Sequence, residues 1–338
     1  MDPLTHTLAG ANLAATRLGG TTRFATAALV LGANLPDVDS ILYFTGHQDA
    51  AFGFRRGWTH GILALLVLPF LQTAVLLLVD RLRPNPARPA NGRMLLLLSA
   101  LAILTHPTLD WLNTYGMRWL MPFRGTWFYG DSVYIMDPWL WLILGAGYLV
   151  GKRPTPLLIG LWVFFTGAIV WVVWRRSTEY LAVVALVAVM LLVALLWRTQ
   201  KHLAGAALVL ATLYIGGRLT IHALTVRAVQ RELPQAARIA TGPHPIDPRR
   251  WNVIAQTPHE YRFGDYIWGE GLTLYPETRR VPVDSPEYRA ARAHPDVDGF
   301  MTWARFPSYT VEREGGVTRV TLSDARRAGG SARVVVLP

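Results

Sequence analysis

Long apolar runs separated by short polar connections dominate the first two-thirds of the chain. A helix that spans a bilayer needs about 20 apolar residues, and fewer where it is only partly inserted. Two shorter runs, 3–16 and 24–36, reach only about 20 Å as helices and predict a helical hairpin that is re-entrant or packed inside a bundle. Six further uncharged runs predict membrane-spanning helices: 62–79, 94–109, 138–151, 154–174, 180–197 and 203–217.

The last third of the chain has a different pattern. After a helical linker to about residue 242, residues 243–338 contain short stretches of β-type sequence, such as 316–322 and 332–337, separated by proline and glycine. We therefore predict a mainly α fold. It consists of a polytopic membrane helix bundle in residues 1–217, followed in residues 218–338 by a small α+β or mostly β soluble domain.

The distribution of charge supports this division. Residues 1–217 hold 16 Lys and Arg and 9 Asp and Glu, or 25 charges in 217 positions, whereas residues 218–338 hold 17 and 13, or 30 in 121. A single soluble globule is excluded, because ordinary soluble domains are about 25% charged throughout. The net charge of +11 does not predict nucleic-acid binding, since most N-terminal cations stand in short loops between apolar runs. The chain has no cysteine, which excludes a thiolate metal site.

The cations also indicate an orientation. If every run crosses the membrane, ten cations fall on one side, four of them in the 80–93 loop, and six fall on the other. The positive-inside rule makes the richer side cytoplasmic. The histidines and aspartates at the ends of the N-terminal runs, and the C-terminal domain, are then expected on the extracytoplasmic face.

Histidine and aspartate are retained in a part of the chain that otherwise excludes charge. An ionised group in an apolar segment costs several kcal/mol unless it is paired or metal-bound, so these residues are expected to have partners. They stand in five motifs: Asp2-Pro-Leu-Thr-His6, Asn34-Leu-Pro-Asp37-Val-Asp39, Trp58-Thr-His60-Gly61, His106-Pro-Thr-Leu-Asp110 and Gly130-Asp131 through Asp137-Pro138.

The spacing within these motifs favours a metal site. His106 and Asp110 are four residues apart and share one face of a helix, which Pro107 is expected to kink or restart so that His106 stands exposed at its start. The proline before Asp37 favours an irregular turn in which Asp37 and Asp39 converge. Imidazole and carboxylate without thiolate suit zinc first, with manganese or iron as alternatives, and the number of ligands is compatible with one or two ions.

Plain structural interpretations remain open for these residues. Paired groups on one helix can simply hydrogen-bond each other, a lone histidine can bond within the bundle, and aspartates that precede a helix can act as N-caps. The residues concerned are His6, Asp37, Asp39, His106 and Asp110, and also Asp131 and Asp137, for which capping competes evenly with ligation. Arg118 and Arg124, in the loop 113–137, can hold an anionic phosphate or serve only as surface charge.

The five motifs and their order resemble the YdjM-type family of inner-membrane metal-dependent hydrolases. The resemblance covers residues 1–150 and implies a multi-pass bacterial or archaeal cytoplasmic membrane protein with the motif histidines and aspartates as ligands. The order His, Asp, His, His-x-x-x-Asp is also similar to zinc-dependent phospholipase C and P1-type nucleases, which favours phosphoester over amide bonds. A second His-x-x-x-Glu pair, as in those enzymes, is lacking after Asp110.

The resulting hypothesis is a membrane hydrolase that cleaves a phosphoester in a lipid or lipid-linked substrate by a metal-activated water. The expected ligands are His6, Asp37, Asp39, His60, His106 and Asp110, with Asp131 and Asp137 as additional candidates. Asp39 is the expected general base, and His6 is a ligand or a proton donor. Arg118 and Arg124 are expected to contact the substrate phosphate. Two other classes remain open: a proton- or cation-coupled transporter that uses the Asp/His cluster, and a non-catalytic scaffold with a structural metal.

Overall fold

The computed structural model describes residues 1–45, 48–151, 203–282, 285–326 and 332–337, with five single positions between 152 and 171. The chain divides into two compact units. A helical unit comprises Met1–Val38, Arg56–Ile221 and Pro243–Pro248, and a sheet unit comprises Asp39–Arg55, His222–Gly242 and Arg249–Pro338. The boundary falls inside a continuous helix, at residue 221, and the segment Asp39–Arg55 joins the sheet unit although it lies far from it in sequence.

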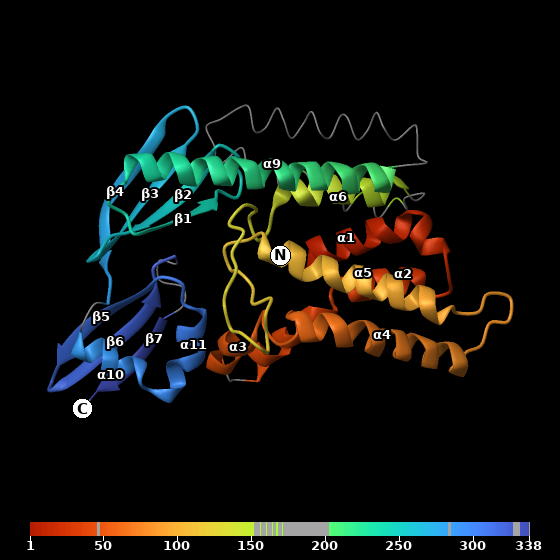
Figure 1. The fold of residues 1–338 in the computed structure, drawn as a ribbon, viewed down its shortest axis with the longest axis horizontal. Coiled ribbons are helices and arrows are strands. Elements are labelled where there is room, and N and C mark those ends of the chain that lie inside the picture. The colour runs from red at the N-terminus through yellow and green to blue at the C-terminus, as the bar shows by residue number, and fades with distance from the viewer. Residues whose placement is uncertain are drawn as a thin grey trace. The chain divides into compact units, whose positions relative to one another are not determined.

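The helical unit is built from packed helices (Figure 1). Its elements are α1 (Pro3–Ala15), η1 (Arg17–Gly20), α2 (Ala25–Gly32), the start of η2 (Leu35–Phe44), α4 (Ile62–Leu82), α5 (Gly92–Trp111), α6 (Pro138–Gly151) and the first part of α9 (Leu203–Glu232). The Asp2 carboxylate caps α1 by accepting hydrogen bonds from the backbone N–H groups of Leu4 and Thr5, and Asn91 caps α5 in the same way.

The predicted N-terminal hairpin is present as α1 and α2, which pack against each other. Gly10 permits the close approach, because a Cβ atom at this position would lie 2.5 Å from the carbonyl oxygen of Leu29. Both helices also contact α5, and α1 contacts α6.

Three helices of the described residues are long and apolar enough to cross a membrane: α4, α5 and α9. The bent pair of α2 and η2 raises this number to four if it acts as one span. This is fewer than the six spans predicted. α6 forms over the predicted run 138–151, but it is not among the candidate spans found in the described residues. The predicted spans 154–174 and 180–197 lie outside the described residues, apart from the five single positions within the first of them.

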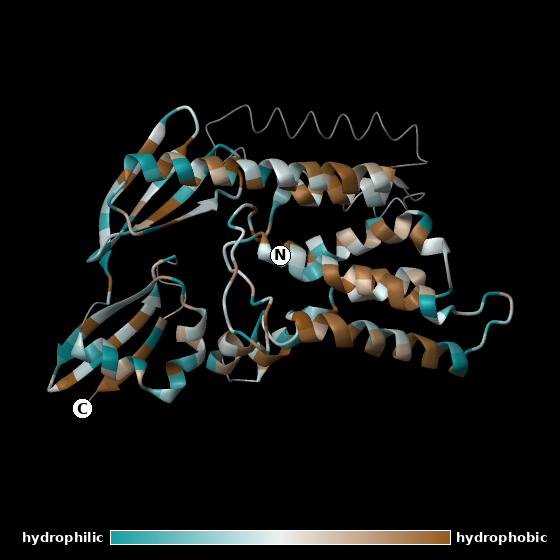
Figure 2. Cartoon of the chain, viewed as in Figure 1, coloured by the Kyte–Doolittle hydropathy of each residue, from teal (hydrophilic) through white to brown (hydrophobic). Residues whose placement is uncertain are grey.

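Apolar side chains on the candidate spans remain exposed in the isolated chain. Leu66, Phe70 and Leu82 on α4 are each more than 60% exposed, and Figure 2 shows hydrophobic residues along α4 and α5. Exposed apolar surface of this extent indicates that a membrane or a partner protein covers it.

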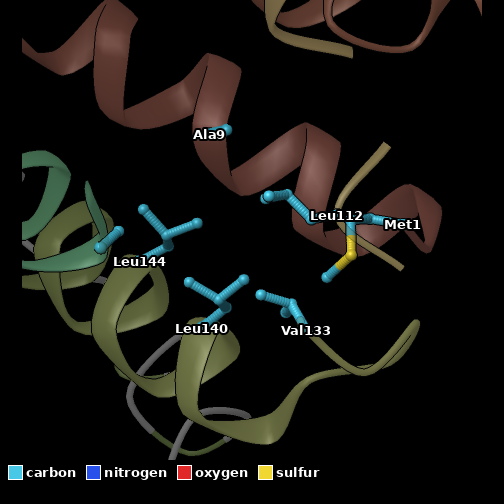
Figure 3. Close-up of a cluster of buried hydrophobic side chains, with 7 residues drawn as sticks. Met1, Ala9, Leu112, Val133, Leu140 and Leu144 are labelled. Carbon is cyan, nitrogen blue, oxygen red and sulfur yellow. The ribbon is translucent and has the colours of Figure 1, made fainter. Parts of the chain in front are cut away.

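Two hydrophobic clusters fix the helices that border the site. One joins α1, α6, α9 and the chain after α5, and it contains Met1, Ala9, Leu112, Val133, Leu140, Leu144 and Ala211 (Figure 3). The other joins α2, α4 and α5 through residues such as Leu29, Leu76 and Leu95. Because the packing holds α1, α2 and α5 together, polar side chains that face inward from them are brought into contact.

The sheet unit confirms the predicted β-rich domain. β1 (Arg238–Pro243), β2 (Arg250–Gln256), β3 (Glu260–Ile267) and β4 (Gly271–Arg280) form one sheet in that order, with β2–β3 and β3–β4 antiparallel. β5 (Pro307–Glu314), β6 (Val317–Asp324) and β7 (Ala332–Leu337) form a second, antiparallel sheet. The unit also contains α3 (Gln48–Phe54), α10 (Pro286–Arg292), η4 (Pro295–Val297) and α11 (Asp298–Trp303).

Side-chain contacts hold the distant segments of the sheet unit together. The end of α9 packs on the first sheet, where Val229 and Leu233 contact Val253. α3 packs on α11, and the Asp49 carboxylate accepts hydrogen bonds of 2.7 Å from the backbone N–H groups of Gly299 and Phe300. Asp49 thereby caps the first turn of α11 and anchors the segment Asp39–Arg55.

Candidate metal centre

Four of the predicted ligands converge inside the helical unit. They are Asp37 in η2, His60 in the turn before α4, and His106 and Asp110 in α5, and each offers a ligand atom within 4.8 Å of the others. The side chains of His60, His106 and Asp110 are fully buried, and that of Asp37 is 16% exposed. In the part of the chain that the structure describes, this is the one group of three or more such residues with metal-ligand geometry.

The donor atoms are spaced as a small divalent cation requires. The Nε2 atoms of His60 and His106 are 3.1 Å apart, and they lie 3.4 and 3.5 Å from Oδ2 of Asp110. Both nitrogens are 3.7 Å from Oδ1 of Asp37. A tetrahedral zinc ion with ligands at about 2.0–2.1 Å separates neighbouring donors by about 3.3 Å. The donor set therefore fits one such ion, with Asp37 as its loosest member.

Local structure explains how α5 contributes two donors. His106 and Asp110 are one turn apart and share a face, as their spacing predicts. The helix runs through Pro107 rather than restarting there, so His106 lies within α5 and is buried, not exposed at a helix start. His60 is placed by the close approach of its chain to the loop after α5: a Cβ atom on Gly61 would lie 2.5 Å from the carbonyl oxygen of Met121.

The second ring nitrogen of each histidine has its own contact. Nδ1 of His106 lies 2.7 Å from the carbonyl oxygen of Ala33, which can only accept, so this nitrogen carries the proton. Nε2 of His106 consequently presents a lone pair to the centre. Nδ1 of His60 lies 2.8 Å from the Thr59 hydroxyl. Contacts of this kind fix ring orientation in metal-bound histidines.

The two oxygens of the Asp110 carboxylate face different groups. Oδ2 faces the imidazoles of His60 and His106, whereas Oδ1 forms an ion pair with Nη2 of Arg56 at 3.0 Å. Oδ1 also lies 3.3 Å from Nε2 of His6 and against the α-amino group of Met1. The cationic groups of Arg56 and Met1 lie at Oδ1, so Oδ2 remains directed at the Nε2 atoms of His60 and His106.

Arg56 is a residue of this site that sequence reasoning missed. Its buried guanidinium donates to Oδ1 of Asn113 at 3.0 Å and to the carbonyl of Gly116 at 3.3 Å, and it lies over the ring of Tyr115. In the sequence it is one of two adjacent loop arginines counted only as a topological charge. The sole signal was its position four residues before His60, which by itself does not distinguish it from its neighbour.

Two further predicted residues lie outside the set of four donors. The ring of His6 is buried and stacks on His106 with centroids 3.7 Å apart, so it borders the group through Asp110 and His106. Asp39 belongs to the sheet unit, where its buried carboxylate pairs with Nε of Arg55 at 3.3 Å. η2 has about three residues per turn, so side chains two positions apart, such as Asp37 and Asp39, point in different directions and do not converge.

The loop between α5 and α6 holds the remaining candidates, and none belongs to the set of donors. Asp137 caps α6 through the N–H groups of Trp139 and Leu140 and accepts from the Tyr214 hydroxyl at 3.0 Å, as its capping interpretation requires. Asp131 is buried and has a φ of 46°. Arg118 is buried with its guanidinium over Trp127, and Arg124 is exposed.

Fold and site together define a class: a helical membrane protein with a buried Asp/His group that could hold a metal ion. The sequence model of the YdjM inner membrane protein family matches residues 1–200, more than half of the chain. The chain therefore belongs to the YdjM inner membrane protein family. No curated protein and no solved structure matches it.

Proposed function

We propose that this protein is a metal-dependent hydrolase that cleaves a phosphoester in a lipid or lipid-linked substrate. The observation that carries the proposal is the uneven donor set: three fully buried donors and a fourth, Asp37, that is partly exposed and farthest from the imidazoles. Catalytic zinc sites use three protein ligands and keep a fourth position for water or substrate, and a metal held here would supply a water activated for attack on phosphorus.

The residues of this chain then take distinct roles. His60, His106 and Asp110 hold the metal, while Arg56 and His6 hold Oδ1 of Asp110. Asp37 is the group placed to accept the proton of the attacking water, because its carboxylate is the donor that solvent reaches. We assign the general base to Asp37 and not to Asp39, as the sequence suggested, because Asp39 is paired with Arg55.

The substrate class rests on the surroundings of the site. The exposed apolar surface of α4 and α5 supports a site beside lipid, where a lipid-linked substrate needs no transfer into water. In the same unit, Arg118 and Arg124 are the cations proposed to contact the phosphate. If every apolar run crosses the membrane, ten cations lie in the loops on the side opposite the site and six lie on the side of the site. The positive-inside rule makes the richer side cytoplasmic, which supports a site that opens on the extracytoplasmic side.

A non-catalytic scaffold with a structural metal is the second candidate. It is favoured by the presence of four protein donors, which complete a tetrahedral shell without water. The two functions differ in what Asp37 does: a structural metal needs it as a ligand, whereas a catalytic metal needs it as a base.

An Asp37→Asn variant separates the two candidates. The purified protein is loaded with zinc or manganese and assayed against a panel of phospholipids and phosphodiesters. Hydrolysis by the wild type, with turnover reduced about 100-fold or more in the variant at unchanged metal content, supports the hydrolase. Loss of the metal in Asp37→Asn, with no hydrolysis by the loaded wild type, supports the scaffold. Arg55→Gln is the matched control, because it changes a charge outside the donor set.

A further inference from the structure

The sheet unit contains a cavity of about 830 Å³. It is lined by the end of β4, by β5 and β6, and by α10, and β4 and β5 are each the edge strand of their sheet. Figure 1 shows α10 beside the second sheet. The cavity size is in the range of small-molecule sites, which is about 300–1,000 Å³.

The charge of the lining is positive. Three arginines, Arg279, Arg280 and Arg313, line the cavity together with one carboxylate, Glu287. Arg313 pairs with Glu287, and Arg279 lies 3.8 Å from Glu277, whose side chain is 70% exposed. Arg280 is exposed and makes no side-chain hydrogen bond or ion pair with any residue that the structure describes. Arginine forks bind phosphate and carboxylate oxygens in a bidentate manner, so this lining favours an anion.

Hydroxyl groups form the neighbouring wall. Ser308 and Ser323 face each other across β5 and β6 with their oxygens 2.8 Å apart, and Thr310 and Thr321 are the next pair on the same face. All four residues line the cavity. A hydroxyl can donate or accept, so this part of the lining suits a polar, oxygen-rich ligand body. Val311 and Ala332 add apolar contact surface, and Tyr309 adds an aromatic ring.

We propose that this cavity binds a phosphate ester with a polar body, with the arginines contacting the phosphate and the hydroxyls contacting the body. A bare phosphate ion would fill only a small part of 830 Å³, which is why an ester is proposed. The inference rests on the sheet unit alone and does not depend on the metal centre.

Calorimetric titration of the full chain in detergent tests the proposal. The probes are sn-glycerol 1-phosphate, which is the soluble part of a lipid headgroup, and inorganic phosphate, with glycerol as the uncharged control. A chelator is present throughout, so that phosphate bound by a metal does not contribute. The variants are Arg280→Gln, Arg279→Gln/Arg280→Gln, and the matched control Arg292→Gln, an exposed arginine of α10 that does not line the cavity.

The expected result is saturable binding of glycerol 1-phosphate that weakens about tenfold or more in Arg280→Gln and less than about twofold in Arg292→Gln. Tighter binding of the ester than of inorganic phosphate supports the proposal, whereas equal binding of the two shows that the hydroxyls do not contact the ligand body and overturns it. Absence of saturable binding, or equal weakening in Arg280→Gln and Arg292→Gln, overturns the proposal. Arg280→Gln decides the matter if the double variant does not fold, because the exposed Arg280 side chain makes no hydrogen bond or ion pair with the described residues.

Discussion

His60 and His106 face each other through their Nε2 atoms at a separation of 3.1 Å, fully buried, with two carboxylate oxygens within 3.7 Å of both nitrogens. The Ala33 carbonyl fixes the proton of His106 on Nδ1, so at least one of the facing nitrogens has a lone pair. Carboxylate oxygens and imidazole lone pairs that converge in this way repel one another unless a proton or a cation lies between them. This arrangement is the physical basis of the proposed metal centre.

Replacement of His106 by alanine is expected to remove the metal. The change deletes one of the three buried donors and leaves His60, Asp110 and the partly exposed Asp37, which no longer complete a four-donor shell. Metal content per chain, measured by mass spectrometry after purification, should fall from about one equivalent to near zero. His259→Ala is the control, since His259 is exposed in the turn before β3 and should leave the metal in place. Equal metal content in wild type and His106→Ala would contradict the assignment.

Arg56→Gln is expected to weaken metal binding without touching a ligand. Arg56 holds Oδ1 of Asp110, and loss of that contact lets the carboxylate turn away from the imidazoles. Loss of such supporting contacts weakens metal affinity about 10- to 100-fold, which competition with a chelator measures. The adjacent Arg55→Gln should have little effect, because Arg55 pairs with Asp39 in the sheet unit. The same loss of affinity in both variants would show that charge, and not the contact with Asp110, matters.

The sheet unit is expected to lose stability in acid through Asp324. Burial alone would raise the pKa of this carboxylate, but the Arg326 guanidinium and the backbone N–H groups of Arg326 and Arg305 outweigh it and hold the pKa below the ordinary value of 3.8. A lowered pKa gives stability that is present above the ordinary pKa and is lost as the pH falls through the folded-state pKa.

Thermal unfolding of the sheet unit between about pH 5 and 2 checks this prediction, followed by hydrogen exchange in β6. The wild type should lose stability progressively below about pH 4, and Asp324→Asn should be less stable at neutral pH by about 1–3 kcal/mol with a flatter acid profile. Parallel acid profiles for the two proteins would exclude Asp324 as the source.

Asp49→Ala is expected to release the segment Asp39–Arg55 from the sheet unit. The substitution leaves two N–H groups of α11 without the carboxylate that accepts from them, at a cost of about 1–2 kcal/mol. Hydrogen exchange in α3 and α11 should accelerate, whereas Asp296→Ala, which removes an 85% exposed carboxylate nearby in sequence, should not change it. Unchanged protection in Asp49→Ala would mean that packing alone holds α3.

The sequence was informative where a short spacing determines the geometry. The interval of four between His106 and Asp110 places them on one face of a helix whatever the tertiary structure, and the uncharged runs place α4, α5 and α9. The uncharged run 138–151 likewise places α6.

Residues whose role depends on tertiary contacts could not be sorted from sequence. Asp37 and Asp39 both follow one proline, and only the turn of η2 separates them into a donor of the metal group and a partner of Arg55. Arg56 and Asp49 are ordinary loop charges until α5 and α11 are placed beside them.

X-ray absorption at the K edge of the bound metal, together with metal content, tests whether the Asp/His group of the purified wild type holds a metal ion. We expect about one zinc or manganese ion per chain, with two imidazole nitrogens and one or two carboxylate oxygens at about 2.0–2.2 Å. Protein that binds no metal after reconstitution, or a bound ion whose first shell contains no imidazole, would contradict it.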